Sequence, residues 1–256
     1  MSRIFDNIDQ HLGDHLKTVI TDYDRLDAAV GYFNLRGWQF FAPIVDAKEF
    51  KKGTPVARVL IGMSGVEADL ALSEYLQSTV NGSVAADGVD GSIARERHQQ
   101  ALHKFREQLS RGILDQAHYE ALRTLKRHLE EGRVQIKLFT RRPLHGKTYI
   151  CHREDVTNPI TAFVGSSNLT MSGLQHNYEL NVDVVDWDGT KVLAKWFEDR
   201  WNDRYTMDIT SELIELIEES WAGEKQPTPY DVYLKVCWHL SRDVRDGLAE
   251  YGVPTA

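Results

Sequence analysis

The chain has 256 residues, and its 30 Lys and Arg against 38 Asp and Glu give a formal net charge of −8. This acidic balance argues against a protein that coats nucleic acid through overall basicity. A local exception is the segment 137–147, KLFTRRPLHGK, which contains no carboxylate. Two cysteines are too few for a disulfide framework, and neither a membrane-spanning apolar run nor a secretory signal pattern occurs, so we expect a cytoplasmic protein.

The first third of the sequence predicts alternating helices and strands. Residues 2–24 carry apolar side chains at spacings of three and four, which predicts an amphipathic helix. The apolar runs 26–33 and 56–63 predict buried strands, with helical spacing at 37–45 between them. That order predicts a parallel pair of strands joined by a crossover helix, and therefore an α/β sheet. Residues 68–76 are expected to be helical, and 82–91 to form a turn-rich break.

A long charged stretch, 93–131, follows this break. Its apolar stripe is interrupted at Arg111 and Gly112, so it predicts two helices, the second ending at Gly132. These helices could form a clamp that binds a partner or, more simply, a helical layer on the sheet. Further along, we expect strands at 134–139, 147–152, 161–164 and 180–185, a helix at 191–201, a linker at 223–229 and an amphipathic helix at 230–251.

The residues with the most evident chemistry lie at the two ends of a predicted hairpin. His145 and Lys147 precede a strand at a spacing of two, which places both on one face. A histidine can act as nucleophile or general acid, and a lysine can neutralise phosphoryl oxygens without a metal. The next strand ends in GSSN, residues 165–168, where small residues admit a close approach and the Asn168 amide can donate a hydrogen bond. Pairing of the two strands would join both ends into one phosphate site.

These residues resemble the phospholipase D superfamily, whose motif is HxK, an acidic residue five positions after the lysine, and GSxN. His145, Lys147 and GSSN match the motif, whereas the acidic position is occupied by His152. The run NYELNVDVV, residues 177–185, resembles the strand that follows GSxN in the family's bacterial endonucleases, with Glu179 at the position of a glutamate that supports the catalytic histidine. The resemblance covers residues 20–206 and implies the phospholipase D-like fold, a mixed sheet flanked by helices, with 82–131 as a helical insertion.

The resemblance implies a phosphodiesterase that needs neither a metal nor another cofactor. His145 would attack phosphorus to give a phosphohistidine, a second histidine would protonate the leaving oxygen, and water would then release the product. Lys147 and Asn168 would stabilise the phosphoryl oxygens, and Glu179 would hold the imidazole of His145 in its working tautomer. The family's active site needs two motif copies, and HxK combined with GSxN occurs once here, so we expect a symmetric homodimer.

Similarity to the family's compact endonucleases makes DNA the expected substrate. Ser166 would contact a phosphate, and Arg141 and Arg142 would contact the DNA backbone. Residues 1–222 would form the nuclease domain. Residues 223–256 would form a linker and a helix, and 229–240 resemble the segment that leads to a helicase motor in bacterial restriction and phage-defence proteins. Two alternatives stay open: a catalytically degenerate module that binds DNA or dimerises, which the departure at His152 favours, and a lipid phosphodiesterase.

Overall fold

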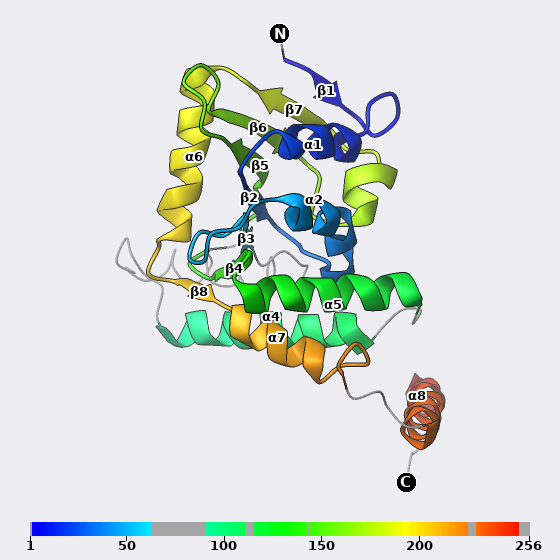
Figure 1. The fold of residues 1–256 in the computed structure, drawn as a ribbon. Helices are drawn as coiled ribbons and strands as arrows, with labels where there is room; N and C mark the ends of the chain where they lie inside the picture. The colour runs from blue at the N-terminus through cyan, green and yellow to red at the C-terminus, as the bar shows by residue number, and fades with distance from the viewer. Residues whose placement is uncertain (1, 63–90, 111–114, 143, 225–228, 251–256) are drawn as a thin grey trace, which may run out of the picture.

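The structure, a computed structural model, describes residues 2–62, 91–110, 115–142, 144–224 and 229–250. Within these ranges, an eight-stranded mixed sheet has the order β1-β7-β6-β5-β2-β3-β4-β8 (Figure 1). Strands β2, β3 and β4 run parallel to one another, and every other neighbouring pair is antiparallel. The strands are β1 Ile4–Phe5, β2 Arg25–Val30, β3 Ala57–Ile61, β4 Val134–Phe139, β5 Lys147–His152, β6 Ile160–Gly165, β7 Asn181–Val184 and β8 Thr206–Asp208. The predicted mixed α/β sheet and its parallel pair, β2 and β3, are confirmed.

Helices pack on both faces of this sheet. One face shares a hydrophobic core with α1 (Leu12–Thr21), η1 (Leu35–Phe40), α2 (Ala42–Ala47), α4 (Gly91–Ser110), α5 (Gln116–Glu131) and α7 (Thr210–Glu218). The opposite face forms a smaller cluster with α6 (Trp187–Trp201), which packs on β4, β5 and β6. A short helical turn, η2 (Ser172–His176), precedes β7, and α8 (Pro229–Glu250) follows residues 225–228.

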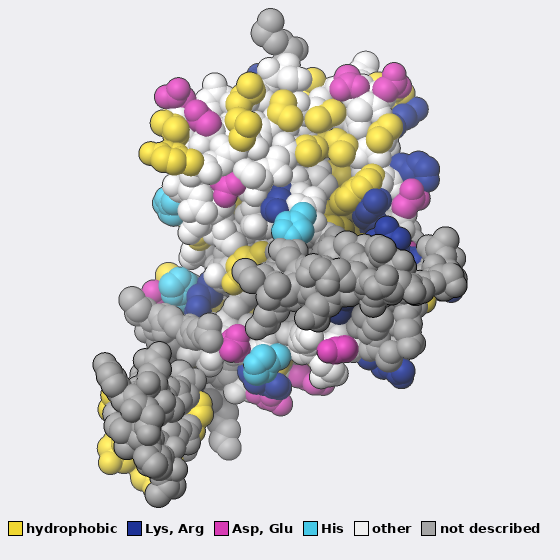
Figure 2. All heavy atoms as spheres, turned by 180° about the vertical axis from the view of Figure 1, so that it is seen from behind, with side chains coloured by type: hydrophobic (Ala, Val, Ile, Leu, Met, Phe, Trp, Pro, Cys, Tyr) yellow, Lys and Arg dark blue, Asp and Glu magenta, His cyan; other side chains and the backbone are white. Residues whose placement is uncertain are grey.

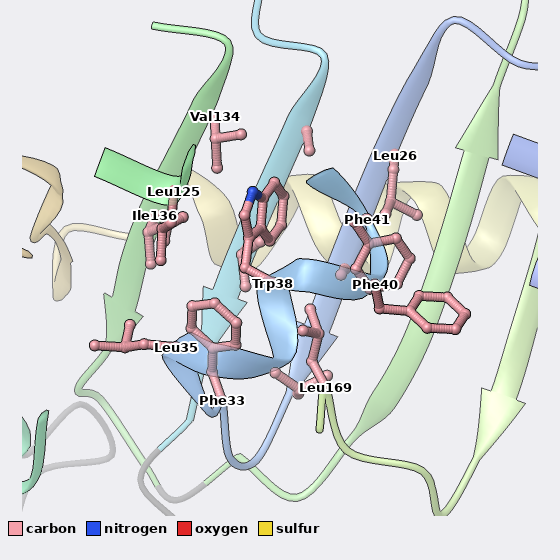
Figure 3. Close-up of a cluster of buried hydrophobic side chains, with 14 of the residues drawn as sticks. Leu26, Phe33, Leu35, Trp38, Phe40, Phe41, Leu125, Val134, Ile136 and Leu169 are labelled. Atoms are coloured by element: carbon pink, nitrogen blue, oxygen red, sulfur yellow. The ribbon is translucent and has the colours of Figure 1, made fainter. Parts of the chain in front are cut away.

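The larger core is built around Trp38 of η1 (Figure 3). Its ring is fully buried, and its Nε1–H donates to Nδ1 of His128 at 3.1 Å. Leu125 of α5 and Ile136 of β4 belong to the same cluster. Because α5 buries its apolar stripe here, α4 and α5 form a helical layer on the sheet, which is the simpler of the two interpretations of 93–131.

Helix α4 extends to Ser110 and α5 begins at Gln116, on either side of the break that the sequence predicts at Arg111 and Gly112. Residues 111–114 lie outside the described part of the chain, and Asp115 then caps α5 by accepting from the His118 N–H at 2.8 Å. The helix ends at Gly132, whose φ of +75° suits a residue without a side chain. The helix expected at 68–76 lies outside the described residues, as does the break expected at 82–91 except for Gly91, which is the first residue of α4.

The prediction of a single helix over residues 2–24 is wrong. Ile4 pairs with Val182 in strand β1, and α1 begins only at Leu12. Between them, the Asp6 carboxylate accepts from the N–H groups of Ile8 and Asp9, and Asn7 adopts a φ of +58°. Such side-chain hydrogen bonds to nearby backbone compete with helix formation, and here they turn the chain away from the helical path.

Candidate active site

One edge of the sheet brings the two ends of the predicted hairpin together. Strand β5 begins where β6 ends, with Lys147 directly opposite Gly165, and Gly165 in turn lies opposite Asn181 at the start of β7. The carboxyl end of β2 reaches the same edge, because β2 runs antiparallel to β5. The hairpin and its register therefore place the HxK and GSSN segments side by side, as the sequence predicts.

His145 lies in the turn that precedes β5 and is exposed. Lys147 is the first residue of the strand, and its Nζ donates to the His145 carbonyl oxygen at 2.8 Å. Two glycines let this turn approach its surroundings closely. A Cβ on Gly62 would lie 2.8 Å from the Leu144 Cβ, and one on Gly146 would lie 3.1 Å from the Trp196 ring. The segment that contains His145 is thus fixed by packing against the end of β3 and against α6.

The GSSN turn is fixed mainly through Ser167, which is fully buried. Its N–H donates to Oδ1 of Asn181 at 3.2 Å, and its Oγ accepts from Nδ2 of Asn181 at 2.9 Å. Its carbonyl oxygen accepts from the Tyr149 hydroxyl at 3.0 Å. The sequence did not predict the role of Asn181, one of two polar residues that alternate with valines in β7. A Cβ on Gly165 would lie 2.6 Å from the Asn181 Cα, so only glycine fits this packing.

Asn168 and Glu179 are each oriented by a neighbour at the same edge. The Asn168 Oδ1 accepts from the Tyr32 N–H at 3.0 Å, so the donor end of its amide is the end left for a ligand. The Ser166 hydroxyl donates to the Glu179 carboxylate and accepts from the Leu180 N–H at 2.9 Å. Ser166 and Glu179 therefore form a connected pair beside the GSSN turn.

The two predicted DNA contacts differ in their surroundings. The Nε of Arg141 lies 2.6 Å from Asp203 Oδ2, and its guanidinium stacks 4.8 Å from the centre of the Tyr205 ring. Arg142 is exposed. With His145, both arginines line an open pocket of about 470 Å³ between the end of β4 and α6. The ion pair with Asp203 already neutralises Arg141, which leaves Arg142 as the better placed cation for a phosphate.

The departure from the family motif lies at the opposite end of β5. The Nε2 of His152 is 2.8 Å from Oδ2 of Asp27, a residue of β2 that is 1% exposed. Arg58 donates to both Asp27 oxygens at 2.7 Å and also pairs with Glu198 of α6. Burial by itself would raise the pKa of Asp27, but the hydrogen bonds from Arg58 and His152 outweigh it and lower the pKa to about 2. This end of β5 therefore keeps a carboxylate, supplied by the neighbouring strand.

A second His-x-Lys triplet, His15 to Lys17, occurs in helix α1 rather than before a strand. His15 stacks on Phe5 at 4.9 Å, and burial lowers its pKa. Lys17 lies over the Phe40 ring at 4.1 Å. No GSxN follows in the sequence apart from residues 165–168, so the combined motif still occurs once.

The described residues contain no cluster of three or more His, Cys, Asp or Glu side chains arranged to hold a metal ion. Likewise, none of the helices in the described ranges has the length and apolar character needed to cross a membrane.

Comparison with known proteins identifies a domain within the chain. Residues 84–201 match the family described as "Cardiolipin synthase, PLD-like domain". No curated protein matches the chain. This similarity agrees with the phospholipase D-like fold expected from the sequence, a mixed sheet flanked by helices.

Three solved structures with a similar fold are Nuc, NucT and a phosphatidylserine synthase. Nuc from Salmonella typhimurium, a phospholipase D family member, is 12% identical with a TM-score of 0.43, covering 81% of this chain and 97% of Nuc. NucT from Helicobacter pylori is 10% identical with a TM-score of 0.41, covering 81% and 98%. Phosphatidylserine synthase from Haemophilus influenzae Rd KW20 is 12% identical with a TM-score of 0.42, covering 94% of this chain but 46% of the synthase. At TM-scores below 0.5 these likenesses carry no argument about function.

Proposed function

We propose, from the similarity of residues 84–201 to a PLD-like domain family, that the protein is a metal-independent phosphodiesterase that cleaves DNA through a phosphohistidine. The observation that carries the proposal is the register of the hairpin, which sets Lys147 opposite Gly165 and so joins the HxK turn to the GSSN turn. The segments that carry the proposed nucleophile, cation and amide donor thus lie side by side at one end of these strands. That set of groups suits a phosphodiester, which carries one negative charge and gains another as the transition state forms.

In the first step, a neutral imidazole nitrogen of His145 attacks phosphorus. The new N–P bond forms as the bond to the leaving oxygen breaks, and a general acid gives that oxygen a proton. Lys147 and the Asn168 amide stabilise the equatorial oxygens. Glu179, oriented through Ser166, supports the imidazole in the tautomer whose attacking nitrogen carries no proton.

In the second step, water attacks the phosphohistidine and the N–P bond breaks. The group that gave up its proton in the first step now takes one from this water, so the enzyme returns to its starting state. We assign this acid and base to His145 of a second copy, because the combined motif occurs once in the chain. A two-fold axis beside the site would bring the two histidines to one phosphate.

The sheet offers a surface for this dimer next to the site. Ile4 and Leu180 are 62% and 65% exposed, and Ile4 lies in one row with Val182 and Val164 on the face of the sheet that carries α6. Helix α6 packs on β4, β5 and β6, so it leaves this part of the face open. Figure 2 shows hydrophobic side chains gathered there. Because Leu180 directly follows Glu179, a partner seated on this surface would approach the catalytic edge.

We test the dimer with Leu180→Asp, which places a charge in the apolar surface. Sedimentation should change from dimer to monomer, and DNA cleavage should fall at least tenfold. Thr18→Asp, an exposed change on α1, serves as the control and should leave both unchanged. A fully active monomer, whether wild type or variant, would contradict the shared site.

We further propose that residues 1–222 are the nuclease domain of a restriction or phage-defence protein, with 223–256 leading to a helicase motor. The support is that α8 exposes apolar side chains along its length, among them Tyr233, Val236 and Trp238. Such a helix is expected to contact another protein surface. The mass of the native polypeptide in its host tests this proposal, and a mass near 29.3 kDa would contradict it.

The ion pair at His152 bears on the alternative of a degenerate module. The absence of the motif's acidic residue at position 152 would favour a catalytically inactive protein. However, Asp27 supplies a carboxylate that pairs with His152 at this end of β5. The direct test is to incubate the purified protein with plasmid and with single-stranded DNA in EDTA, beside His145→Ala. Cleavage that resists the chelator and is lost in the variant supports the nuclease. DNA binding without cleavage would support the degenerate module, and cleavage of phosphatidyl lipids alone would support the lipid enzyme.

A further inference from the structure

The pocket that His145 lines also has lining residues from α6, and these have no role in the proposed catalytic steps. Its floor and sides come from the end of β4, the catalytic turn at 144–146, and the carboxyl half of α6. At about 470 Å³ it falls within the usual size range of small-ligand sites. Arg142, Trp196 and Arg200 belong to its lining.

The charges in this pocket leave two cations for a ligand. Of its two carboxylates, Asp203 pairs with Arg141 at 2.6 Å, and Asp199 pairs with Lys195 at 2.8 Å. The remaining Lys and Arg side chains of the lining are Arg142 and Arg200, and His145 lines the same pocket. An acyl chain would have to desolvate these charges, whereas an anionic ligand would gain from them.

Arg200 lies over an aromatic ring of the same helix. Its guanidinium carbon lies 4.0 Å from the centre of the Trp196 ring, and its Nη1 donates to the Trp196 carbonyl oxygen at 2.9 Å. A guanidinium fixed in this way is a planar cation that can stack on a nucleobase or bind a phosphate. The same Trp196 ring contacts the catalytic turn at Gly146, so the position of this wall and that of His145 depend on each other.

We propose that this pocket is a subsite for the nucleotide adjacent to the scissile phosphate, with Arg142 on its phosphate and the Arg200–Trp196 pair under its base. The inference rests on the proposed function and extends it, because it names the part of a DNA strand that this side of the site holds. Binding here places the next phosphate of the strand beside His145. Arg141, held by Asp203, acts as support for the wall rather than as a DNA contact.

The test measures binding and cleavage separately. A short fluorescein-labelled single-stranded DNA is titrated with Arg142→Gln, Arg200→Gln and, as a matched control outside the pocket lining, Arg204→Gln, with anisotropy read in EDTA at several salt concentrations. We expect each pocket variant to raise Kd roughly tenfold, in line with the loss of one charge-assisted contact, and Arg204→Gln to raise it less than twofold. The slope of log Kd against log salt should fall by about one in Arg142→Gln, because that side chain is assigned to a phosphate.

Cleavage supplies the second readout. The ratio of kcat/KM on DNA to kcat/KM on methyl p-nitrophenyl phosphate, a phosphodiester without a nucleotide, should fall about tenfold in both pocket variants. Arg200→Lys keeps the positive charge but lacks the planar guanidinium. It should regain less than half of the DNA-binding free energy that Arg200→Gln loses relative to wild type. An equal loss in Arg204→Gln, or no loss in either pocket variant, would overturn the subsite. A wild-type protein that binds DNA through these arginines but hydrolyses neither substrate would instead contradict the proposed function and leave the subsite standing.

Discussion

Restoring the family's acidic residue at position 152 should destabilise this protein. In the phospholipase D superfamily an acid stands where this chain has His152, so His152→Asp would usually count as a repair. Here the Nε2 of His152 lies 2.8 Å from the Asp27 carboxylate, and Asp27 is 1% exposed. The substitution removes a favourable partner and sets a second negative charge beside the first.

The size of the effect follows from this geometry. Two like charges about 4 Å apart repel by about 4 kcal/mol at an effective dielectric constant near 20. Solvent reaches position 152, whose side chain is 21% exposed, and Arg58 and Arg25 attract both carboxylates, so part of the repulsion is offset. We expect a loss of about 2 to 3 kcal/mol in the free energy of unfolding at pH 7, and for a chain of this size that lowers Tm by roughly 5 to 10 °C.

Urea unfolding of a set of variants would measure the effect. His152→Gln, whose amide can still donate to Asp27, should cost only about 1 kcal/mol. The double variant Asp27→Asn with His152→Asp moves the carboxylate from β2 to β5 and should recover at least half of the loss. Because the introduced carboxyl gains from protonation and a glutamine does not titrate, the stability difference between His152→Asp and His152→Gln should also shrink as the pH falls from 7 to 5. Equal stability of His152→Asp and wild type at pH 7 would refute the reasoning.

Three further predictions concern the fold and the site. Lys147→Met removes the cation beside the scissile phosphate and should lower kcat for EDTA-resistant cleavage by about 10² to 10³, and a loss below threefold would contradict its role. Gly165→Ala forces a Cβ to within 2.6 Å of the Asn181 backbone and should cost about 3 kcal/mol in thermal or urea unfolding, whereas Gly91→Ala, with open space around it, should be neutral. The pKa of Asp27 is lowered from 3.8 to about 2, so its ionised form contributes about 2 kcal/mol to the free energy of unfolding. This contribution is present above pH 4 and is lost as the pH falls toward 2. Asp27→Asn should therefore flatten the stability curve in that window, and an unchanged slope in acid unfolding would count against the ion pair.

The sequence predicts best the parts of this fold that are set by local pattern. Strands β4 and β5 have the predicted bounds, and Gly132 ends α5 as its sequence indicates. Each of these elements has a signal in its own residues: apolar residues that alternate with polar ones in β4, an apolar run in β5, and a glycine directly after the apolar stripe of α5. The hairpin was predictable for the same reason, because both of its strands are apolar and its two ends carry the motif residues.

The elements that the sequence did not predict depend on partners far along the chain. Strand β8 has three residues and exists because it pairs with β4, and α7 follows it onto the core. The contacts of Ser167 with Asn181 and of His152 with Asp27 join different strands, and only the register of the sheet brings them together. A departure from a motif can therefore be compensated by a residue that no local pattern identifies.

The central claim is that His145 forms a covalent bond to phosphorus. DNA labelled with ³²P is mixed with enzyme, quenched in alkali within the first turnover, and the protein is digested and mapped by mass spectrometry. We expect label on the peptide that contains His145, stable in base and lost in acid, and no label in His145→Gln. Cleavage that proceeds with no labelled protein, or label on any other residue, would contradict it.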